Sequence, residues 1–171
     1  MIMAMAIVSF VSLDAPTSTE RNMRTSQQGI DLIKKFESFS PKPYLCPACV
    51  PTIGYGTTVY PDGKKVTLKD KTISKEQAEA LLFNDIRTFE VAVLSSVRVQ
   101  LKQHEFDALV SFVYNVGVNA FKSSNLLNRL NSERRNEAAD QFKQWVHAGG
   151  KALPGLIKRR DEERSLFLGE K

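Results

Sequence analysis

The order of strand-patterned and helix-patterned stretches constrains this chain more than any other feature. Residues 44–60 are rich in Thr, Ile, Tyr and Val, and Gly54 and Gly56 interrupt them. From residue 74 onward, apolar residues recur at the three- and four-residue spacing of one helix face almost to the end. A chain of 171 residues is long enough to bury a core. The pattern therefore predicts a mainly helical α+β protein with one small strand-bearing lobe.

The first part of the chain predicts a helix followed by a hairpin. Residues 25–39 place their apolar side chains on one face, and the prolines that follow are expected to end this helix. After the strand-patterned stretch, Pro61-Asp62-Gly63 has the composition of a turn. Residues 65–68 are then expected to return as the partner strand.

The rest of the chain predicts a succession of helices. Ser74-x-x-Gln77 is a capping box, which starts a long helix. Residues 104–116 are apolar enough to form a buried central helix. The expected helices cover residues 74–97, 104–116, 119–130, 133–147 and 155–168.

These elements predict one domain preceded by an arm. Residues 1–25 are first apolar and then polar, and we expect them to form the arm. In residues 26–171, a helix-plus-hairpin lobe (26–73), a connecting helix (74–97) and a helical lobe (98–171) are expected to flank a substrate cleft. A cleft of this kind suits an extended polymer.

The start of the arm leaves its role open. Residues 1–13 carry no charge, but they are fewer than the roughly 20 residues that span a bilayer. They also lack the basic beginning and the cleavage site of a secretory signal. The arm is therefore either a plain extension or a segment for export or membrane tethering.

Charge and composition limit the classes of partner and cofactor that the protein is expected to bind. The formal charge of +5 favours anionic partners, such as a wall polymer or a membrane surface, or it only serves solubility. Nucleic acid is not expected, because no helix-turn-helix or aromatic-basic platform is recognisable. No metal site is expected, since His104 and His147 lack paired ligand spacing. Two cysteines cannot form a disulfide scaffold, so folding depends on the core.

Glu37 is the first candidate for chemistry. It ends the first expected helix beside Phe36, close to the apolar face. Apolar surroundings and the negative end of the helix dipole both disfavour the ionised form. A general acid needs the protonated form, so Glu37 is a candidate acid; the alternative is a surface glutamate at a helix end.

An ordered series of motifs runs through the chain and gives this glutamate a context. It consists of Gly29-Ile30-Asp31-Leu32-Ile33-Lys34-Lys35-Phe36-Glu37, Tyr44, Thr52-Ile53-Gly54-Tyr55-Gly56, Asn115-Val116-Gly117, Trp145 and the run from Leu153 to Arg164. In order and spacing, the series resembles the phage-type lysozymes, or endolysins, of glycoside hydrolase family 24. The resemblance covers residues 28–168.

The resemblance implies a lysozyme-like fold and a function. Such enzymes hydrolyse the β-1,4 bond between N-acetylmuramic acid and N-acetylglucosamine in peptidoglycan, which lyses the host, and they need no metal or organic cofactor. By the same resemblance Glu37 is the general acid, Cys46 occupies the second catalytic position, and Thr52 positions water. Most members have Asp where this chain has Cys46, although the family tolerates Cys there. A monomer is expected.

Cys46 has several interpretations. As a thiolate it would stabilise an oxocarbenium-like transition state or attack it, and as a neutral thiol it would leave room for water beside Thr52. It could also be only a small buried side chain. With Cys49 it could form a regulatory disulfide that removes the thiol from the site. A thioredoxin-like redox enzyme is not favoured, because no helix start follows Cys49.

Further residues are candidates for binding and support. Tyr44 and Tyr55 are expected to contact sugar, or else to fill the small lobe, and Asn115 is expected to shape the cleft or cap a helix. Arg159 and Arg160 are candidates for an ion pair with Glu37 or its helix. The surrounding run 158–164 alternates basic and acidic residues, for which a solvated face is the default.

Two other functions remain alternatives. A lytic transglycosylase works with a single catalytic glutamate, which the loss of Asp makes relevant. A protein that binds peptidoglycan without cleaving it is the second. The resemblance also implies location in the host cytoplasm before release and action at the periplasmic cell wall, unless residues 1–13 act as an export anchor.

Overall fold

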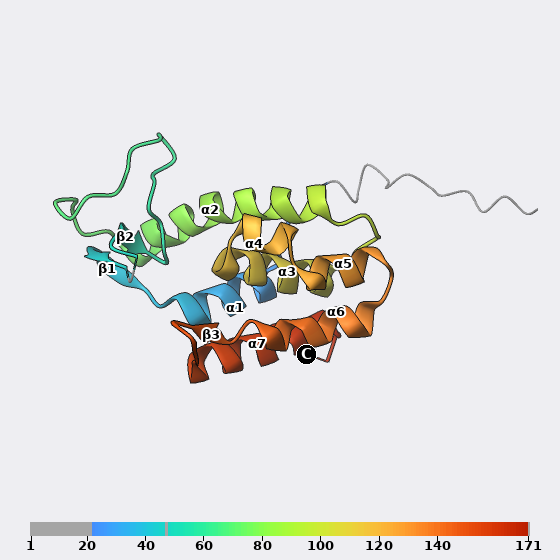
Figure 1. Ribbon diagram of the computed structural model, residues 1–171. Helices are drawn as coiled ribbons and strands as arrows, with labels where there is room; N and C mark the ends of the chain where they lie inside the picture. Colours follow the sequence, from blue (N-terminus) through green and yellow to red (C-terminus); the bar gives the residue numbers. More distant parts are fainter. Residues whose placement is uncertain (1–21, 47, 171) are drawn as a thin grey trace, which may run out of the picture.

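The computed structural model describes residues 22–46 and 48–170 (Figure 1). The expected export or tethering segment, residues 1–13, lies outside them. The α-helices are α1 (Gln27–Glu37), α2 (Lys75–Ser96), α3 (Gln103–Val116), α4 (Val118–Lys122), α5 (Asn125–Asn131), α6 (Arg135–Gln141) and α7 (Pro154–Phe167). The strands are β1 (Ser40–Leu45), β2 (Pro51–Gly54), β3 (His147–Ala148) and β4 (Lys151–Ala152), and η2 (Phe142–Gln144) is a 3₁₀ helix.

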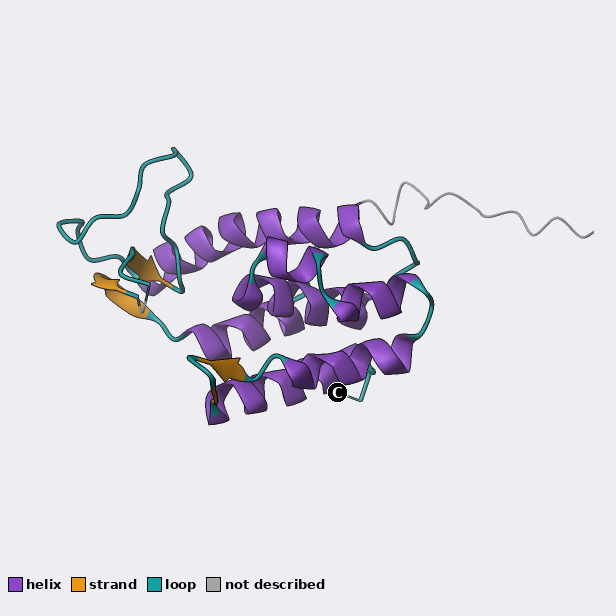
Figure 2. Ribbon diagram, viewed as in Figure 1, coloured by secondary structure: helices purple, strands orange, loops and turns teal. Residues whose placement is uncertain are grey.

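The fold is mainly helical α+β, as the sequence predicts. α3 is central and packs against α1, α2 and α7. The long helix α2 and the last helix α7 run along opposite sides of the molecule, and β1 and β2 lie at one end (Figures 1 and 2). In the part of the chain that the structure describes, no helix combines the length and the apolar character that crossing a membrane requires.

The helix α3 confirms the prediction of a buried central helix. Its run from Phe106 to Val113 is buried residue after residue, and the apolar members of that run belong to the main core. A helix that is apolar on all sides fits only where other helices cover it on all sides. The covering helices α1, α2 and α7 come from distant parts of the sequence, so α3 joins the two lobes into one core.

The hairpin has a different partner strand from the expected one. β2 pairs antiparallel with β1, which precedes it, and Tyr44 lies opposite Thr52. The prediction that residues 65–68 form the partner strand is wrong, because only Lys65 forms an isolated bridge, with Val59. Gly54 adopts a φ of +67°, which turns the chain at the end of β2 and stops the strand there.

Several helices are shorter than the sequence predicts. α1 ends at Glu37, because Ser38 has a φ of 53°, outside the helical region. The expected helix over 119–130 is two helices, and the Ser124 hydroxyl caps the second by accepting from the Leu127 amide at 3.1 Å. The expected helix over 133–147 is also divided, into α6, η2 and β3.

Two carboxylates attach the start of the described chain to the core. Glu90 of α2 accepts hydrogen bonds from Arg24 Nη1 at 3.0 Å and from the Thr25 amide at 2.7 Å. Asp107 of α3 accepts from the Ser26 amide at 2.9 Å. The last residues of the expected arm are therefore fixed on α2, while the division into arm and domain stays a prediction.

A hydrogen bond joins the hairpin lobe to α2. Thr57 is buried, and its hydroxyl donates to Asp85 Oδ2 at 2.6 Å. Burial raises the pKa of Asp85, and hydrogen bonds from Thr57 and Asn84 oppose this rise. The carboxylate is thus held in a place that disfavours its charge.

We predict that Ser74→Ala lowers the free energy of unfolding by about 1 kcal/mol. The Ser74 hydroxyl accepts from the Gln77 amide at 3.2 Å, and the Gln77 side chain accepts from the Ser74 amide at 2.8 Å. Urea unfolding measures the change. Ser96→Ala, at the other end of α2, is the control and should have no such cost; equal losses in the two variants would contradict the role of the cap.

We predict that Asp85→Asn raises the melting temperature at neutral pH. Because the folded-state pKa of Asp85 is raised, ionisation of this carboxyl group lowers the free energy of unfolding. This loss is absent below the ordinary aspartate pKa of about 4 and complete above the raised pKa of the folded state. The advantage of the variant should therefore shrink as the pH falls toward 4. Thermal melts between pH 3 and 8 test this, with the exposed Asp161→Asn as control. A variant less stable than the wild type at pH 7 would refute the prediction.

Candidate active site

Glu37 is the last residue of α1, and an arginine from the far end of the chain holds it. Arg159 of α7 donates from Nη1 to Glu37 Oε1 at 2.6 Å, and the glutamate side chain is 20% exposed. The sequence indicates Arg159 as a candidate ion-pair partner of Glu37 or its helix, and the structure has this contact.

The hairpin brings Tyr44, Cys46 and Thr52 to the same end of α1. Burial raises the pKa of Tyr44, and the charges of Glu37 and Cys46 raise it further. Tyr44 therefore lies within the electrostatic field of both Glu37 and Cys46. Thr52 lies opposite Tyr44 in the strand pair; it is 3% exposed and donates its hydroxyl to the Val50 carbonyl at 2.9 Å.

Cys46 lies where β1 ends, on a tight turn. The backbone amide of Val50, followed by that of Ala48, lowers the pKa of its thiol, and Thr52 contributes to the same effect. Hydrogen bonds to sulfur stabilise the thiolate, which is the nucleophilic form. Cys46 and the exposed Cys49 are both free thiols in this structure, and the regulatory disulfide between them stays a hypothesis.

Two expected binding residues differ in their surroundings. Tyr55 is 3% exposed and packs against Phe39 with ring centroids 5.6 Å apart, so it belongs to the core. This favours the alternative that Tyr55 fills the small lobe, and its role as a sugar contact stays a prediction. Asn115 is exposed at the end of α3, and its side-chain oxygen accepts a hydrogen bond from Arg160. Its role in binding stays a prediction.

Three charged residues of α7 are buried, contrary to the expectation of a solvated face. Arg159 is 3% exposed, and Arg160 and Glu163 are 0% exposed. Only Arg159 contacts Glu37, while Arg160 Nη1 lies 2.8 Å from Glu163 Oε2. Burial raises the pKa of Glu163, and the two arginines oppose the rise. Sequence reasoning missed Glu163, although these residues share a helix face with the apolar Leu166 and Phe167.

A pocket of about 220 Å³ lies beside the hairpin, between the turn after β2 and the helices α2 and α3. Tyr114 forms one wall: its hydroxyl donates to the Tyr55 carbonyl at 3.0 Å, and its ring lies 4.9 Å from that of Phe89. Burial raises the pKa of Tyr114, and the charges of Glu37 and Asp85 add to this. One wall of the pocket thus lies within the electrostatic field of Glu37, and the lining residues are Gly56, Thr58, Val59, Asp85, Thr88, Phe89 and Tyr114.

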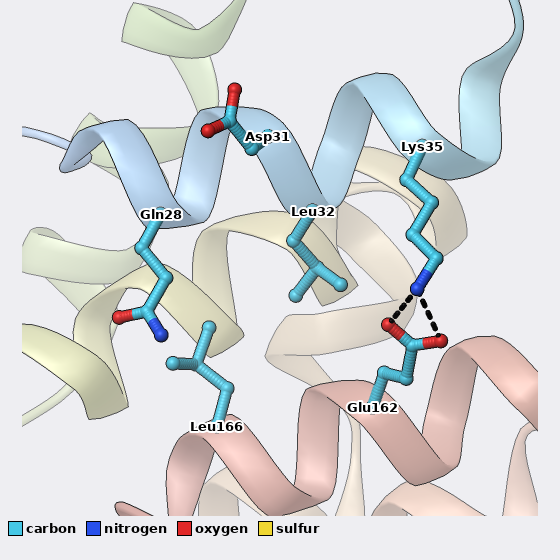
Figure 3. A pocket seen from close by; sticks show the side chains of 6 residues that line it. All are labelled: Gln28, Asp31, Leu32, Lys35, Glu162 and Leu166. Atoms are coloured by element: carbon cyan, nitrogen blue, oxygen red, sulfur yellow. Dashed lines mark hydrogen bonds and ion pairs between the residues drawn. The ribbon is translucent and has the colours of Figure 1, made fainter. Parts of the chain in front are cut away.

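A second pocket of about 200 Å³ separates α1 from α7 (Figure 3). Leu32 and Leu166 point toward one another across it, and Lys35 Nζ lies 2.7 Å from both carboxylate oxygens of Glu162. Its lining contains none of the residues that the sequence assigns to chemistry. Among residues 22–46 and 48–170, no group of three or more His, Cys, Asp or Glu is arranged to hold a metal ion.

Comparison with known proteins identifies the family. The family model for phage lysozyme matches residues 34–163. The endolysin of Bacillus phage B103 is 45% identical over 146 residues, which cover 85% of this chain and 54% of that relative. The chain thus spans about half the length of this relative. The SAR-endolysin of Bacteriophage PS119 is 37% identical over 127 residues, 74% of this chain and 73% of that protein.

Solved structures agree with this assignment. The endolysin of Escherichia coli O157:H7 phage FAHEc1 superposes with a TM-score of 0.79 at 37% sequence identity, covering 87% of this chain and 96% of that one. The prediction of a lysozyme-like fold is therefore confirmed. On its sequence and its fold, the chain belongs to the phage lysozyme family.

Proposed function

We propose that this chain is an endolysin that hydrolyses the β-1,4 bond between N-acetylmuramic acid and N-acetylglucosamine in peptidoglycan. One observation carries the proposal: Arg159 holds Glu37 at the end of α1, and Tyr44 of the following hairpin lies within the electrostatic field of both Glu37 and Cys46. A glycosidase needs an acid on one side of the sugar and a second group on the other. Family membership and the pocket beside the hairpin support the same function.

In this mechanism Glu37 donates a proton to the glycosidic oxygen as the bond to the sugar breaks. The sugar ring then carries positive charge, which the thiolate of Cys46 stabilises. A water molecule held near the Thr52 hydroxyl attacks the ring carbon and gives its proton to the thiolate. Cys46 thus replaces the usual Asp, and its lowered pKa supports this role, because a larger fraction of the thiol is then charged.

The pocket between the hairpin and α2 offers a place for a neighbouring sugar. Tyr114 and Phe89 supply aromatic surface, while Asp85 and Thr88 supply groups for hydrogen bonds to sugar hydroxyls. The exposed Tyr44 provides a second aromatic surface. The proposed substrate is an extended polymer, and in this proposal the enzyme works as a monomer without metal or cofactor.

The site of action follows from this substrate. The protein acts at the cell wall after release from the host cytoplasm. Attachment of residues 1–13 to the membrane is an alternative route, and the similarity to a SAR-endolysin is the reason to keep it. The net charge of +5 would favour weak contact with anionic wall polymers or lipid.

We predict that Glu37→Gln lowers wall lysis by about 10³-fold, within the range typical of a lost general acid. The amide keeps the shape of the side chain but cannot donate the proton. The clearing of a peptidoglycan suspension measures the effect, and circular dichroism checks the fold. Lysis by Glu37→Gln at the wild-type rate would refute the mechanism. Sedimentation of wild-type protein with walls that it does not clear would instead indicate a binding protein.

We predict that Cys46→Ser lowers lysis substantially, whereas Cys46→Asp retains measurable activity. A serine hydroxyl carries no charge at neutral pH, while an aspartate restores the carboxylate that the family usually has. The same clearing assay compares the two variants, with Cys49→Ser as the matched control. Full activity in Cys46→Ser would leave only Thr52 and water as partners of Glu37.

The reaction products separate hydrolysis from transglycosylation. Hydrolysis leaves a reducing muramic acid end, whereas a lytic transglycosylase leaves a 1,6-anhydro ring. We expect reducing ends, and mass spectrometry of the released fragments distinguishes the two. Anhydro products would replace the hydrolase with the enzyme that uses Glu37 alone.

A further inference from the structure

The contacts of Arg159 show that the partner of Glu37 is itself held by other groups. Its Nη1 donates to Glu37 Oε1 at 2.6 Å, its Nε donates to Glu163 Oε1 at 3.0 Å, and its Nη2 donates to the Ser111 carbonyl at 3.1 Å. The guanidinium also lies over the Phe36 ring, 5.6 Å from its centroid. Each nitrogen of the guanidinium therefore has a different acceptor, and its orientation toward Glu37 is fixed.

Glu163 is fixed in turn by groups from two helices. The Ser111 hydroxyl of α3 donates to Glu163 Oε1 at 2.7 Å. Arg160 Nη1 lies 2.8 Å from Oε2, but neither atom has an aligned hydrogen bond to a described residue, so this contact is an attraction between charges. Arg160 is held separately, by Asn115 and by the Phe112 ring 5.0 Å from its guanidinium carbon. Glu163 is completely buried, so water does not weaken these interactions.

Glu163 compensates part of the positive charge in this cluster. Arg159 and Arg160 contribute two positive charges, Glu163 contributes one negative charge, and Glu37 contributes a second only while it is ionised; Tyr44 and Tyr114 also lie in the field of Glu37. Without Glu163, two buried guanidinium groups would have Glu37 as their remaining acidic partner in the cluster. They would then hold Glu37 in its ionised form, which cannot donate a proton.

We propose that Glu163 is a positioning residue for Glu37: it orients Arg159 and compensates part of its charge, so that the guanidinium stays directed at the Glu37 carboxyl group. This inference rests on the proposed role of Glu37 as the general acid. The role differs from simple support of the fold, because the loss of Glu163 should change the pH dependence of the activity and not only the amount of folded protein.

The test is the pH profile of Glu163→Gln on soluble glycan oligomers of peptidoglycan. We expect a kcat about ten-fold lower with KM unchanged, and an alkaline limb of kcat/KM moved to lower pH by about one unit. Asp161→Asn is the matched control, since it removes the same charge from an exposed position of the same helix and should leave the profile unchanged. Glu163→Asp, which keeps the charge, should restore the alkaline limb.

The outcomes separate this inference from the proposed function. A folded Glu163→Gln whose pH profile coincides with that of Asp161→Asn overturns the role of Glu163 alone. Lysis by Glu37→Gln overturns the proposed function instead. If Glu163→Gln does not fold, Ser111→Ala is the deciding variant. It keeps every charge but removes one of the two hydrogen bonds to Glu163 Oε1, and we expect a kcat about three-fold lower at unchanged KM. Wild-type kcat in that variant overturns the inference.

Discussion

The burial of charged groups between α3 and α7 is the constraint on which the active-site end of this molecule depends. Arg160 and Glu163 are shielded from water, and Arg159 is nearly so. Unpaired charges in such a place would be very costly, so each must meet an opposite charge or a hydrogen-bond partner. Ser111, Asn115 and Glu37 supply partners from α3 and α1. The same pairing of buried charges therefore holds the three helices together and orients the candidate acid.

Much of the architecture could be predicted from the sequence, because it depends on local signals. The capping box at Ser74 and the apolar run of α3 act within a few residues, and both features are present as expected. The partner of β2 could not be predicted in this way. Strand pairing depends on where the chain turns, and the positive φ at Gly54 ends the strand before residues 65–68 can pair with it.

The residues of the candidate site also fall into two groups: those that sequence motifs indicate, and those that depend on contacts between distant parts of the chain. The assignments of Glu37, Cys46 and Thr52 came from a resemblance, and the structure gathers the end of α1 with the hairpin that bears the other two. Glu163 and Tyr114 went unnoticed, because their importance depends on contacts between helices that lie far apart in the sequence. Alternating charges on α7 resemble a solvated surface until α3 is known to cover them. The sequence alone leaves two alternatives for Tyr55, since an aromatic residue beside glycines fits a core as well as a cleft.

The attachment of residues 24–26 has a mechanical consequence. Glu90 on α2 and Asp107 on α3 hold this segment just before α1 begins, through the Thr25 amide at 2.7 Å and the Ser26 amide at 2.9 Å. A pulling force applied to the chain ahead of Arg24 would be borne by these two helices. The load would therefore enter α2 and α3 before it reaches the start of α1. Tension ahead of Arg24 would thus act first on two helices of the core and not directly on the helix that carries Glu37.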